Sequence, residues 1–183
     1  MSETEGFWGS HRHKVDGKGR VSIPSDFRAV LEAEDPKRSG TEPARVLIHY
    51  GRPGRQRHLR CFTMRVKQEI LAGIEALPRG SQRRRKLERD FTARSVMSRV
   101  DETGRLVLSQ ALRDQVGVTD TALFVAMGDS FEIWNPEIYD EEDAKFDEID
   151  DRLPEDFDLL ELLPRGGPGE GEEDPLDSML RGG

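Results

Sequence analysis

Two arginines, Arg20 and Arg105, stand at equivalent places in two similar stretches of the chain, each directly after a glycine and four residues after an aspartate. Arginine carries a planar fork of N–H donors that pairs with two acceptors on a guanine edge or on a phosphate. Arg20 and Arg105 are therefore the first candidates for contacts with DNA, with a solvated surface charge as the alternative for each. Lys18 precedes Arg20 by two residues, so both project to one side of an extended chain, and we expect Lys18 to contact phosphate.

Other cations flank the same stretches. Lys14 and Arg99 each precede one of the two turns by two residues, and we expect them to add contacts to DNA. The basic run 83–86 could extend this footprint, or it could be a solvated helix face or a contact between subunits. For every one of these cations, the alternative interpretation is an ordinary surface charge.

The residues between the aspartate and the arginine have the chemistry of a turn. Glycine tolerates a positive φ, and Asp-Gly favours tight hairpins, so Gly19 and Gly104 are expected to have a structural role. Phosphate would repel the carboxylates of Asp16 and Asp101, so we expect these to orient the turns or to pair with an arginine. Two hairpin turns of one kind are thus predicted.

The similarity extends beyond the turns. Residues 13–31 and 98–116 align at an offset of 85, with apolar positions matched as well as turn residues. The identical pairs are Val15 and Val100, Asp16 and Asp101, Gly19 and Gly104, Arg20 and Arg105, and Arg28 and Arg113. Each unit is too small to bury its own apolar face, so a duplicated, pseudo-symmetric pair is predicted.

Each unit predicts two short strands around its turn, then a helix, then two more strands. The expected strands include residues 12–15, 20–23, 45–49, 59–62, 122–127 and 131–134. Ser25 and Ser109 are the expected helix N-caps, and Gly117 is the expected end of the second helix. A helical spacer, interrupted at 78–80, should occupy residues 64–91, and Asn135-Pro136 should start a helix that runs to about Arg152.

Few residues suggest catalysis or metal binding. His11 and His13 alternate on one strand, but no Cys or carboxylate stands at a matching ligand spacing. Cys61 lies in an apolar strand and is expected to be a core residue. No phosphate-binding P-loop sequence occurs, and no nucleophile–base pair is evident. We therefore expect no enzyme activity, no metal and no cofactor.

Charge is divided unevenly along the chain. Residues 1–135 hold 24 Lys and Arg against 18 Asp and Glu, whereas residues 136–183 hold 4 against 18. A basic body suits a polyanion. The acidic tail could shield that body or could bind a partner, and residues 158–163 suggest a short amphipathic helix for such a partner. Neither a signal peptide nor a membrane span is evident, which predicts a cytoplasmic protein.

The motifs of the chain come in the order Phe7-Trp8-Gly9-Ser10-His11, then Val-Asp-Gly-Lys-Gly-Arg with Ser-Ile-Pro, a helical spacer and a second Val-Asp-x-x-Gly-Arg. In this order of motifs the chain resembles the MraZ family over about residues 7–150. The resemblance implies an α+β fold: a tandem, pseudo-symmetric, AbrB-type swapped-hairpin β-barrel with flanking helices. It also implies binding to short direct repeats in promoter DNA, regulation of the division and cell-wall gene cluster, a ring-shaped homo-oligomer and association with the nucleoid. No cofactor is implied.

The chain departs from the family pattern in three places. Thr103 stands where a polar or basic residue is common, the loop 51–57 is longer than a hairpin needs, and the acidic tail lies outside the resemblance. The expected divisions are a first repeat, a helical linker, a second repeat, a C-terminal helix and a partly disordered tail, at residues 7–63, 64–91, 92–136, 137–153 and 154–183.

The leading hypothesis is a sequence-specific transcriptional regulator, acting as a repressor of its own cluster. Two alternatives stay open at this stage. One is a nucleoid-associated oligomer that binds DNA without sequence preference, and the other is an antitoxin-like protein of the same fold that binds a protein partner.

Overall fold

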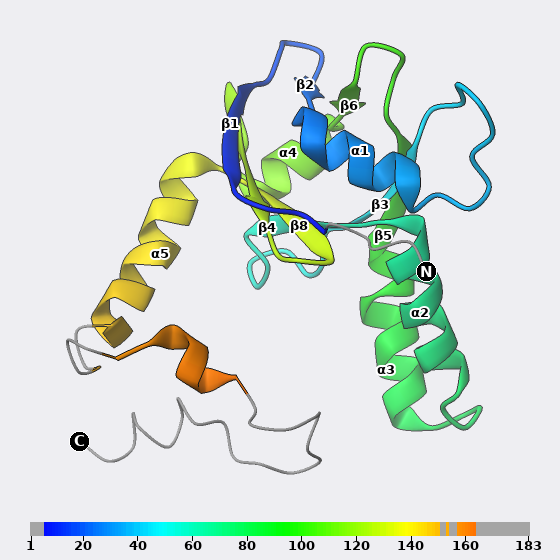
Figure 1. Cartoon of the computed structure of the whole chain (residues 1–183). Helices are drawn as coiled ribbons and strands as arrows, with labels where there is room; N and C mark the ends of the chain where they lie inside the picture. The colour runs from blue at the N-terminus through cyan, green and yellow to red at the C-terminus, as the bar shows by residue number, and fades with distance from the viewer. Residues whose placement is uncertain (1–5, 151–152, 154–156, 164–183) are drawn as a thin grey trace. The chain divides into compact units, whose positions relative to one another are not determined.

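The computed structural model describes residues 6–150, 153 and 157–163. The chain divides into two compact units, Met1–Tyr139 and Asp140–Gly183 (Figure 1). The first unit contains both repeats. The second contains most of helix α5 (Pro136–Asp150) and the 3₁₀ helix η2 (Leu159–Leu162).

Six strands of the first unit form one antiparallel sheet in the order β1-β7-β8-β4-β3-β5. Their bounds are β1 (Ser10–Lys14), β3 (Arg45–His49), β4 (His58–Phe62), β5 (Ser95–Arg99), β7 (Thr121–Ala126) and β8 (Ser130–Trp134). Exchanging each strand for its counterpart in the other repeat reproduces the same order reversed. The sheet therefore has the two-fold pseudo-symmetry that the duplicated sequence predicts.

The two remaining strands, β2 (Arg20–Ser22) and β6 (Arg105–Val107), pair with each other in a separate ribbon. Strand β1 pairs with β7, and β5 pairs with β3. The two strands that flank each turn thus pair with the other repeat, and the first turn is closed by an isolated bridge between Val15, just after β1, and Val21 of β2. The two hairpins are interleaved.

The expected β-barrel is not closed, so this prediction is corrected. The described residues form an open sheet, with β1 and β5 at its two edges, beside the separate β2–β6 ribbon. The reason is that each hairpin diverges after its turn, so one of its strands enters the sheet and the other enters the ribbon. No continuous ladder of hydrogen bonds encloses the core in the part of the chain that the structure describes.

A helix follows the second ribbon strand of each repeat: α1 (Ser25–Ala33) and α4 (Gln110–Val116). Helix α4 begins and ends as expected, because the Ser109 hydroxyl accepts the N–H of Leu112 at 3.4 Å and Gly117 ends the helix at φ 71°. The expected Ser25 cap is wrong. Ser25 is the first helical residue, and the cap position belongs to Pro24, which the alignment matches to Ser109 and whose side chain cannot accept a hydrogen bond.

Two helices separate the repeats, α2 (Met64–Glu75) and α3 (Gln82–Asp90), and the 3₁₀ helix η1 (Thr92–Arg94) leads into β5. The break between α2 and α3 lies where the spacer sequence predicts it. Helix α5 also starts as predicted, since Asn135 Oδ1 accepts the N–H of Glu137 at 2.8 Å. Its predicted end near Arg152 and most of the expected tail, 154–183, lie outside the described residues.

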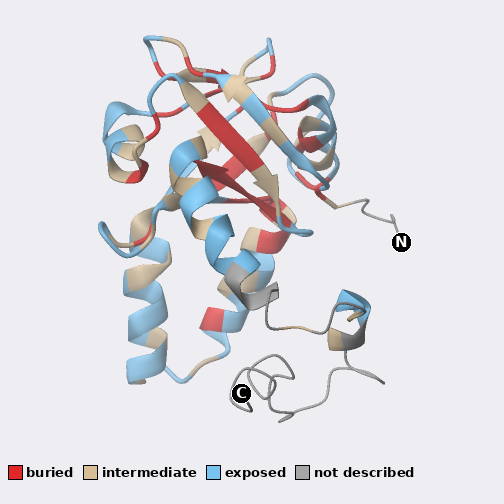
Figure 2. Ribbon diagram, turned by 90° about the vertical axis from the view of Figure 1, so that its left-hand side faces the viewer, coloured by how far each residue is buried: buried red, intermediate tan, exposed pale blue. Residues whose placement is uncertain are grey.

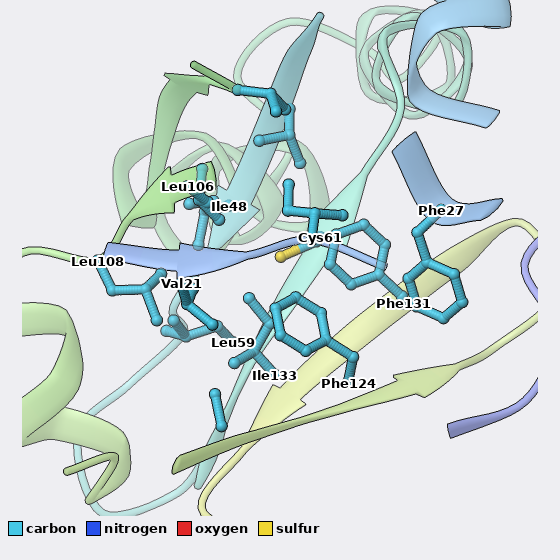
Figure 3. Packing of buried hydrophobic residues seen from close by; sticks show 14 of the residues in the cluster. Val21, Phe27, Ile48, Leu59, Cys61, Leu106, Leu108, Phe124, Phe131 and Ile133 are labelled. Atoms are coloured by element: carbon cyan, nitrogen blue, oxygen red, sulfur yellow. The ribbon is translucent and has the colours of Figure 1, made fainter. Parts of the chain in front are cut away.

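Both repeats contribute to one core. Figure 3 shows Phe27 of the first repeat packed beside Phe131 of the second, with ring centroids 5.2 Å apart. Val21 and Leu106, on the inner face of the ribbon, are both fully buried. In Figure 2 the buried residues concentrate on the strands, whereas helix α3 has no buried residue. Neither repeat encloses a core alone, so the two turns are held in a fixed relation.

Candidate nucleic-acid interface

The first turn is organised by one carboxylate. Asp16 Oδ1 accepts the backbone N–H groups of Lys18 and Arg20, both at 2.9 Å, and Asp16 Oδ2 accepts the Nε–H of Arg20 at 2.6 Å. The backbone of Asp16 also bonds the backbone of Arg20 at 3.0 Å. The aspartate therefore both closes the turn and orients the arginine, which is the role predicted for it.

The second turn repeats this arrangement. Asp101 Oδ1 accepts the backbone N–H groups of Thr103 and Arg105, both at 2.9 Å, and Asp101 Oδ2 accepts the Arg105 Nε–H at 3.1 Å. The Thr103 hydroxyl adds a donor to Asp101 at 2.7 Å. Thr103 thus supports the turn, at a position where the first turn presents a lysine.

These hydrogen bonds keep both carboxylates ionised. The backbone N–H of Arg20, followed by the side chain of the same residue and the N–H of Lys18, lowers the pKa of Asp16 to about 2. The Thr103 hydroxyl and the Arg105 backbone N–H lower the pKa of Asp101 well below its usual range. Each arginine keeps a charged partner at neutral pH, so its orientation does not depend on pH there.

The two glycines allow the turns to pack against the opposite repeat. Gly19 and Gly104 both have φ 78°, a conformation that side chains rarely adopt. A Cβ on Gly19 would collide with the carbonyl oxygen of Leu108, and one on Gly104 would collide with the guanidinium of Arg28. Each glycine carbonyl also accepts a backbone N–H across the repeats, Gly19 from Leu108 at 2.8 Å and Gly104 from Ile23 at 3.0 Å.

The β2–β6 ribbon brings the two arginines together. Arg20 lies opposite Val107, and Ser22 lies opposite Arg105. Side chains alternate along a strand, so these four residues share one face of the ribbon, and the other face is buried. Residues at such diagonal positions lie roughly 7–8 Å apart. The outer face of the ribbon therefore presents both guanidinium groups, with about a third of each side chain exposed.

The remaining predicted contacts surround this face. Lys18 is exposed within the first turn, and Lys14 and Arg99 are exposed at the last positions of β1 and β5, where the chain enters the turns. Figure 1 shows the β1–β2 and β5–β6 turns beside each other at the top of the molecule. All five predicted cations thus lie on or next to the two turns.

Comparison with known proteins identifies the family. A family model described as "MraZ protein, putative antitoxin-like" matches residues 93–158. A protein of Ruegeria pomeroyi named "Transcriptional regulator MraZ" is 50% identical over 163 residues, which cover 88% of this chain and 96% of that protein. The chain belongs to the MraZ family. Proteins of the same name from Ruegeria sp. (strain TM1040) and Cereibacter sphaeroides are 49% and 39% identical, over 88% and 89% of this chain and 96% and 98% of their own lengths.

This MraZ-family chain uses one further matched pair, Arg28 and Arg113, whose role the sequence alone does not indicate. Arg113 of the second repeat donates its Nε–H to the carbonyl of Leu108 at 3.2 Å, directly beside Gly19. Arg28 of the first repeat lies against Gly104. Each helix arginine therefore packs under the turn of the opposite repeat. Their identity at the 85-residue offset was the available signal.

The other candidates occupy structural positions. His11 packs edge-on against the core ring of Phe27, and His13 packs at a tilt against that of Phe124. Cys61 is fully buried, and burial raises the pKa of its thiol, as expected for a core cysteine. The residues that the structure describes contain no cluster of three or more potential metal ligands. Among them, too, no helix combines the length and apolar character that crossing a membrane requires.

Proposed function

We propose that this chain is a sequence-specific, DNA-binding transcriptional regulator whose two Asp-x-x-Gly-Arg turns contact the duplex together. The observation that carries the proposal is the exposed outer face of the β2–β6 ribbon, on which Arg20 and Arg105 stand close together, each held by an aspartate. The name of the relatives, transcriptional regulator, supports the same function.

The geometry allows each arginine to bind its aspartate and to contact DNA at the same time. A guanidinium has five N–H donors, and the Nε–H that binds the aspartate is only one of them. The others suit the O6 and N7 acceptors of guanine, or a phosphate. The flanking cations, Lys14, Lys18 and Arg99, would then contact phosphates and fix the position of the turns on the duplex.

We also propose the finer properties that the family resemblance implies. The interleaved hairpins would be of the AbrB type, within repeats at 7–63 and 92–136 joined by the linker 64–91 and followed by segments 137–153 and 154–183. The protein would repress its own division and cell-wall gene cluster through promoter direct repeats. It would act in the cytoplasm, associated with the nucleoid, as a ring-shaped homo-oligomer. Size-exclusion chromatography with light scattering tests the assembly.

A second candidate function is an antitoxin-like role, which the description of the family model favours. The segment that would serve it is 158–163. Its expected short helix is present as η2, where Asp158 Oδ1 accepts the N–H of Leu160 at 2.9 Å, and Leu159, Leu160 and Leu163 are exposed. An acidic segment with exposed leucines suits a partner that has a basic, apolar groove.

The decisive experiment titrates the protein against the DNA upstream of its own gene and against a scrambled duplex of the same length. Arg20→Ala and Arg105→Ala should each abolish the preference for the upstream DNA. Arg79→Ala, which removes an exposed arginine between α2 and α3, is the control and should keep that preference. Equal binding of both duplexes by wild type would favour the nonspecific nucleoid protein. Failure of the folded protein to bind either duplex would favour the protein-partner role.

A further inference from the structure

A second concentration of positive charge lies away from the turns. Loop 51–57 joins β3 to β4 and carries three arginines within seven residues. It is next to the end of α3 and to η1, because Arg52 forms two-pronged hydrogen bonds to Asp90, at 2.7 and 3.1 Å from its Nη2. Lys86 also pairs with Asp90, and Arg94 Nε lies 4.0 Å from it. One carboxylate is thus shared by three cations.

Two more cations join this cluster. The backbone N–H of Arg55 bonds the carbonyl of Arg52 at 3.1 Å, and Arg89 is three residues after Lys86 on α3, so it lies on the same helix face. In keeping with this placement, desolvation and then repulsion from Arg52, Arg55, Arg89 and Arg94 lower the pKa of Lys86. Arg55, Lys86 and Arg89 are exposed. The nearby carboxylate of Glu88 is paired with Arg84 at 2.8 Å. We call the five residues Arg52, Arg55, Lys86, Arg89 and Arg94 the loop–α3 cluster, and it has a large surplus of positive charge.

The loop is built to hold its arginines in place. Gln56 donates its side-chain N–H groups to the carbonyls of His49, at 3.2 Å, and His58, at 2.9 Å, so it ties the end of β3 to the start of β4. A Cβ on Gly51 would collide with the Gln56 side chain, and Gly51 has φ 59°. The backbone N–H groups of Arg55 and Gln56 both bond the carbonyl of Arg52 at 3.1 Å. A loop so bonded presents charge with little loss of entropy on binding.

The loop–α3 cluster stands at the opposite end of β5 from the second turn. In the β3–β5 pair, Arg45 lies opposite Arg99 at the turn end, and His49 lies opposite Ser95 at the cluster end. Five residues of strand span roughly 13 Å from first to last. In Figure 1, accordingly, the turns lie above the sheet and α3 extends below it. The cluster is therefore a separate surface and not a part of the turn site.

We propose that the loop–α3 cluster is a second DNA-binding surface, which contacts the phosphate backbone without reading sequence. Four of its five cations are arginines, whose planar fork matches the paired oxygens of a phosphate. Bound phosphates would also relieve the mutual repulsion of the cations. The inference depends on the proposed function only in taking duplex DNA as the ligand. Because the two surfaces face opposite ends of the strands, one molecule can contact DNA segments on two sides.

The test removes charge from the cluster without touching the residues bonded to Asp90. The Arg55→Ala/Arg89→Ala protein is compared with Lys67→Ala/Arg79→Ala, a control with the same net charge that alters cations of α2 and of the α2–α3 connection. Affinity for upstream and for scrambled duplex is measured from about 50 to 200 mM salt. The slope of log affinity against log salt is negative, and each lost phosphate contact should reduce its magnitude by about 0.9. The cluster variant, which lacks two cations, should therefore have a slope that is smaller in magnitude by nearly 2.

The pattern of losses separates this inference from the proposed function. The cluster variant should weaken binding to both duplexes by the same factor and keep the preference for upstream DNA, whereas Arg20→Ala should abolish that preference. An unchanged slope in the cluster variant, or an equal decrease in the control, overturns the inference. A polyglutamate peptide is the second probe: weaker binding of this peptide by the variant, with DNA binding unchanged, would assign the cluster to an acidic protein partner and would also overturn it.

Discussion

Two regions of the core are equivalent under the pseudo-symmetry, and each is built from both repeats, but they are filled differently. One lies around helix α1 and the other around helix α4. At three equivalent positions the region around α4 has the smaller residue: Ser98 for His13, Leu112 for Phe27 and Ile48 for Phe124. Around α1 the side chains pack against one another, with Phe27 and Phe124 centroids 6.5 Å apart. Around α4 the equivalent space is an open, apolar groove of about 390 Å³, beside the exposed side chains of Val96, Met97 and Val107.

This difference shows that the pairing of the strands and the volume of the core side chains are independent of each other in this fold. Strand register, turns and the reciprocal glycine contacts are matched in both repeats, since a single register error would break the interleaved hairpins. Side-chain volume is not matched, because a shallow groove at the surface leaves the sheet intact. The following predictions use pairs of equivalent substitutions to break or to sharpen this comparison.

The largest difference is expected between Gly19→Ala and Gly104→Ala. Both impose a side chain on φ 78°, but the new Cβ on Gly19 meets the fixed carbonyl oxygen of Leu108, whereas that on Gly104 meets the movable end of Arg28. We expect a loss of about 4 kcal/mol in the free energy of unfolding for the first and about 2 kcal/mol for the second. Urea denaturation checks this. Equal losses would show that strain in φ, common to both sites, dominates.

A smaller effect is expected when the core residues are exchanged between the repeats. Phe27→Leu opens space in a fully packed region and should reduce the free energy of unfolding by about 2 kcal/mol. Leu112→Phe enters the open groove and should change it by less than about 1 kcal/mol. Thermal and urea unfolding of both proteins test this. A comparable loss in Leu112→Phe would mean that the groove cannot accept the added volume.

The two turns should differ in their response to acid. A carboxylate whose pKa is lowered by folding contributes stability above its ordinary pKa of 3.8, and this contribution is lost as pH falls through the folded-state pKa. The stability gap between wild type and Asp16→Asn should therefore close between about pH 4 and pH 2. The gap for Asp101→Asn should persist to lower pH. Urea unfolding at several pH values measures both gaps, and identical pH dependences would contradict the extra role of Thr103.

The smallest effect is expected at the tips of the turns, where Lys18 has Thr103 as its counterpart in sequence. If the turns contact DNA as proposed, Lys18→Thr should lower the slope of log affinity against log salt by about 0.9, equally for all sequences. Thr103→Lys should raise it by a similar amount. Salt titrations with upstream and scrambled duplexes provide the measurement. An effect on the preference for the upstream duplex would show that Lys18 reads bases.

The local features of the molecule could be predicted from sequence because their causes are local. Asp16 closes its turn through the N–H groups of residues two and four positions later, and Ser109 caps its helix over three residues. The role of Asp101 followed from the same spacing. The strands at 45–49 and 131–134 were predicted almost to the residue.

The features that could not be predicted from the sequence depend on contacts between distant segments of the chain. Nothing near Arg28 indicates that it packs against Gly104, 76 positions later, and only the repeat alignment drew attention to it. The sequence led us to expect a barrel, but the two strands of each hairpin diverge, one into the sheet and one into the ribbon. This could not be predicted locally, because each strand pairs with a strand of the other repeat. The loop–α3 cluster was also missed, because loop 51–57 and α3 are brought together by Asp90.

The pairing of β1 with β7 also determines when each part of the chain can fold during synthesis. Lys14 pairs with Thr121, 107 residues later, so this fold has a high contact order and should form slowly. During synthesis, β1 has no partner until β7 has left the ribosome, and the aromatic residues of the first repeat stay uncovered until then. A nascent chain stalled after α3 would expose an unpaired strand edge, and chaperones and proteases would encounter it before DNA does.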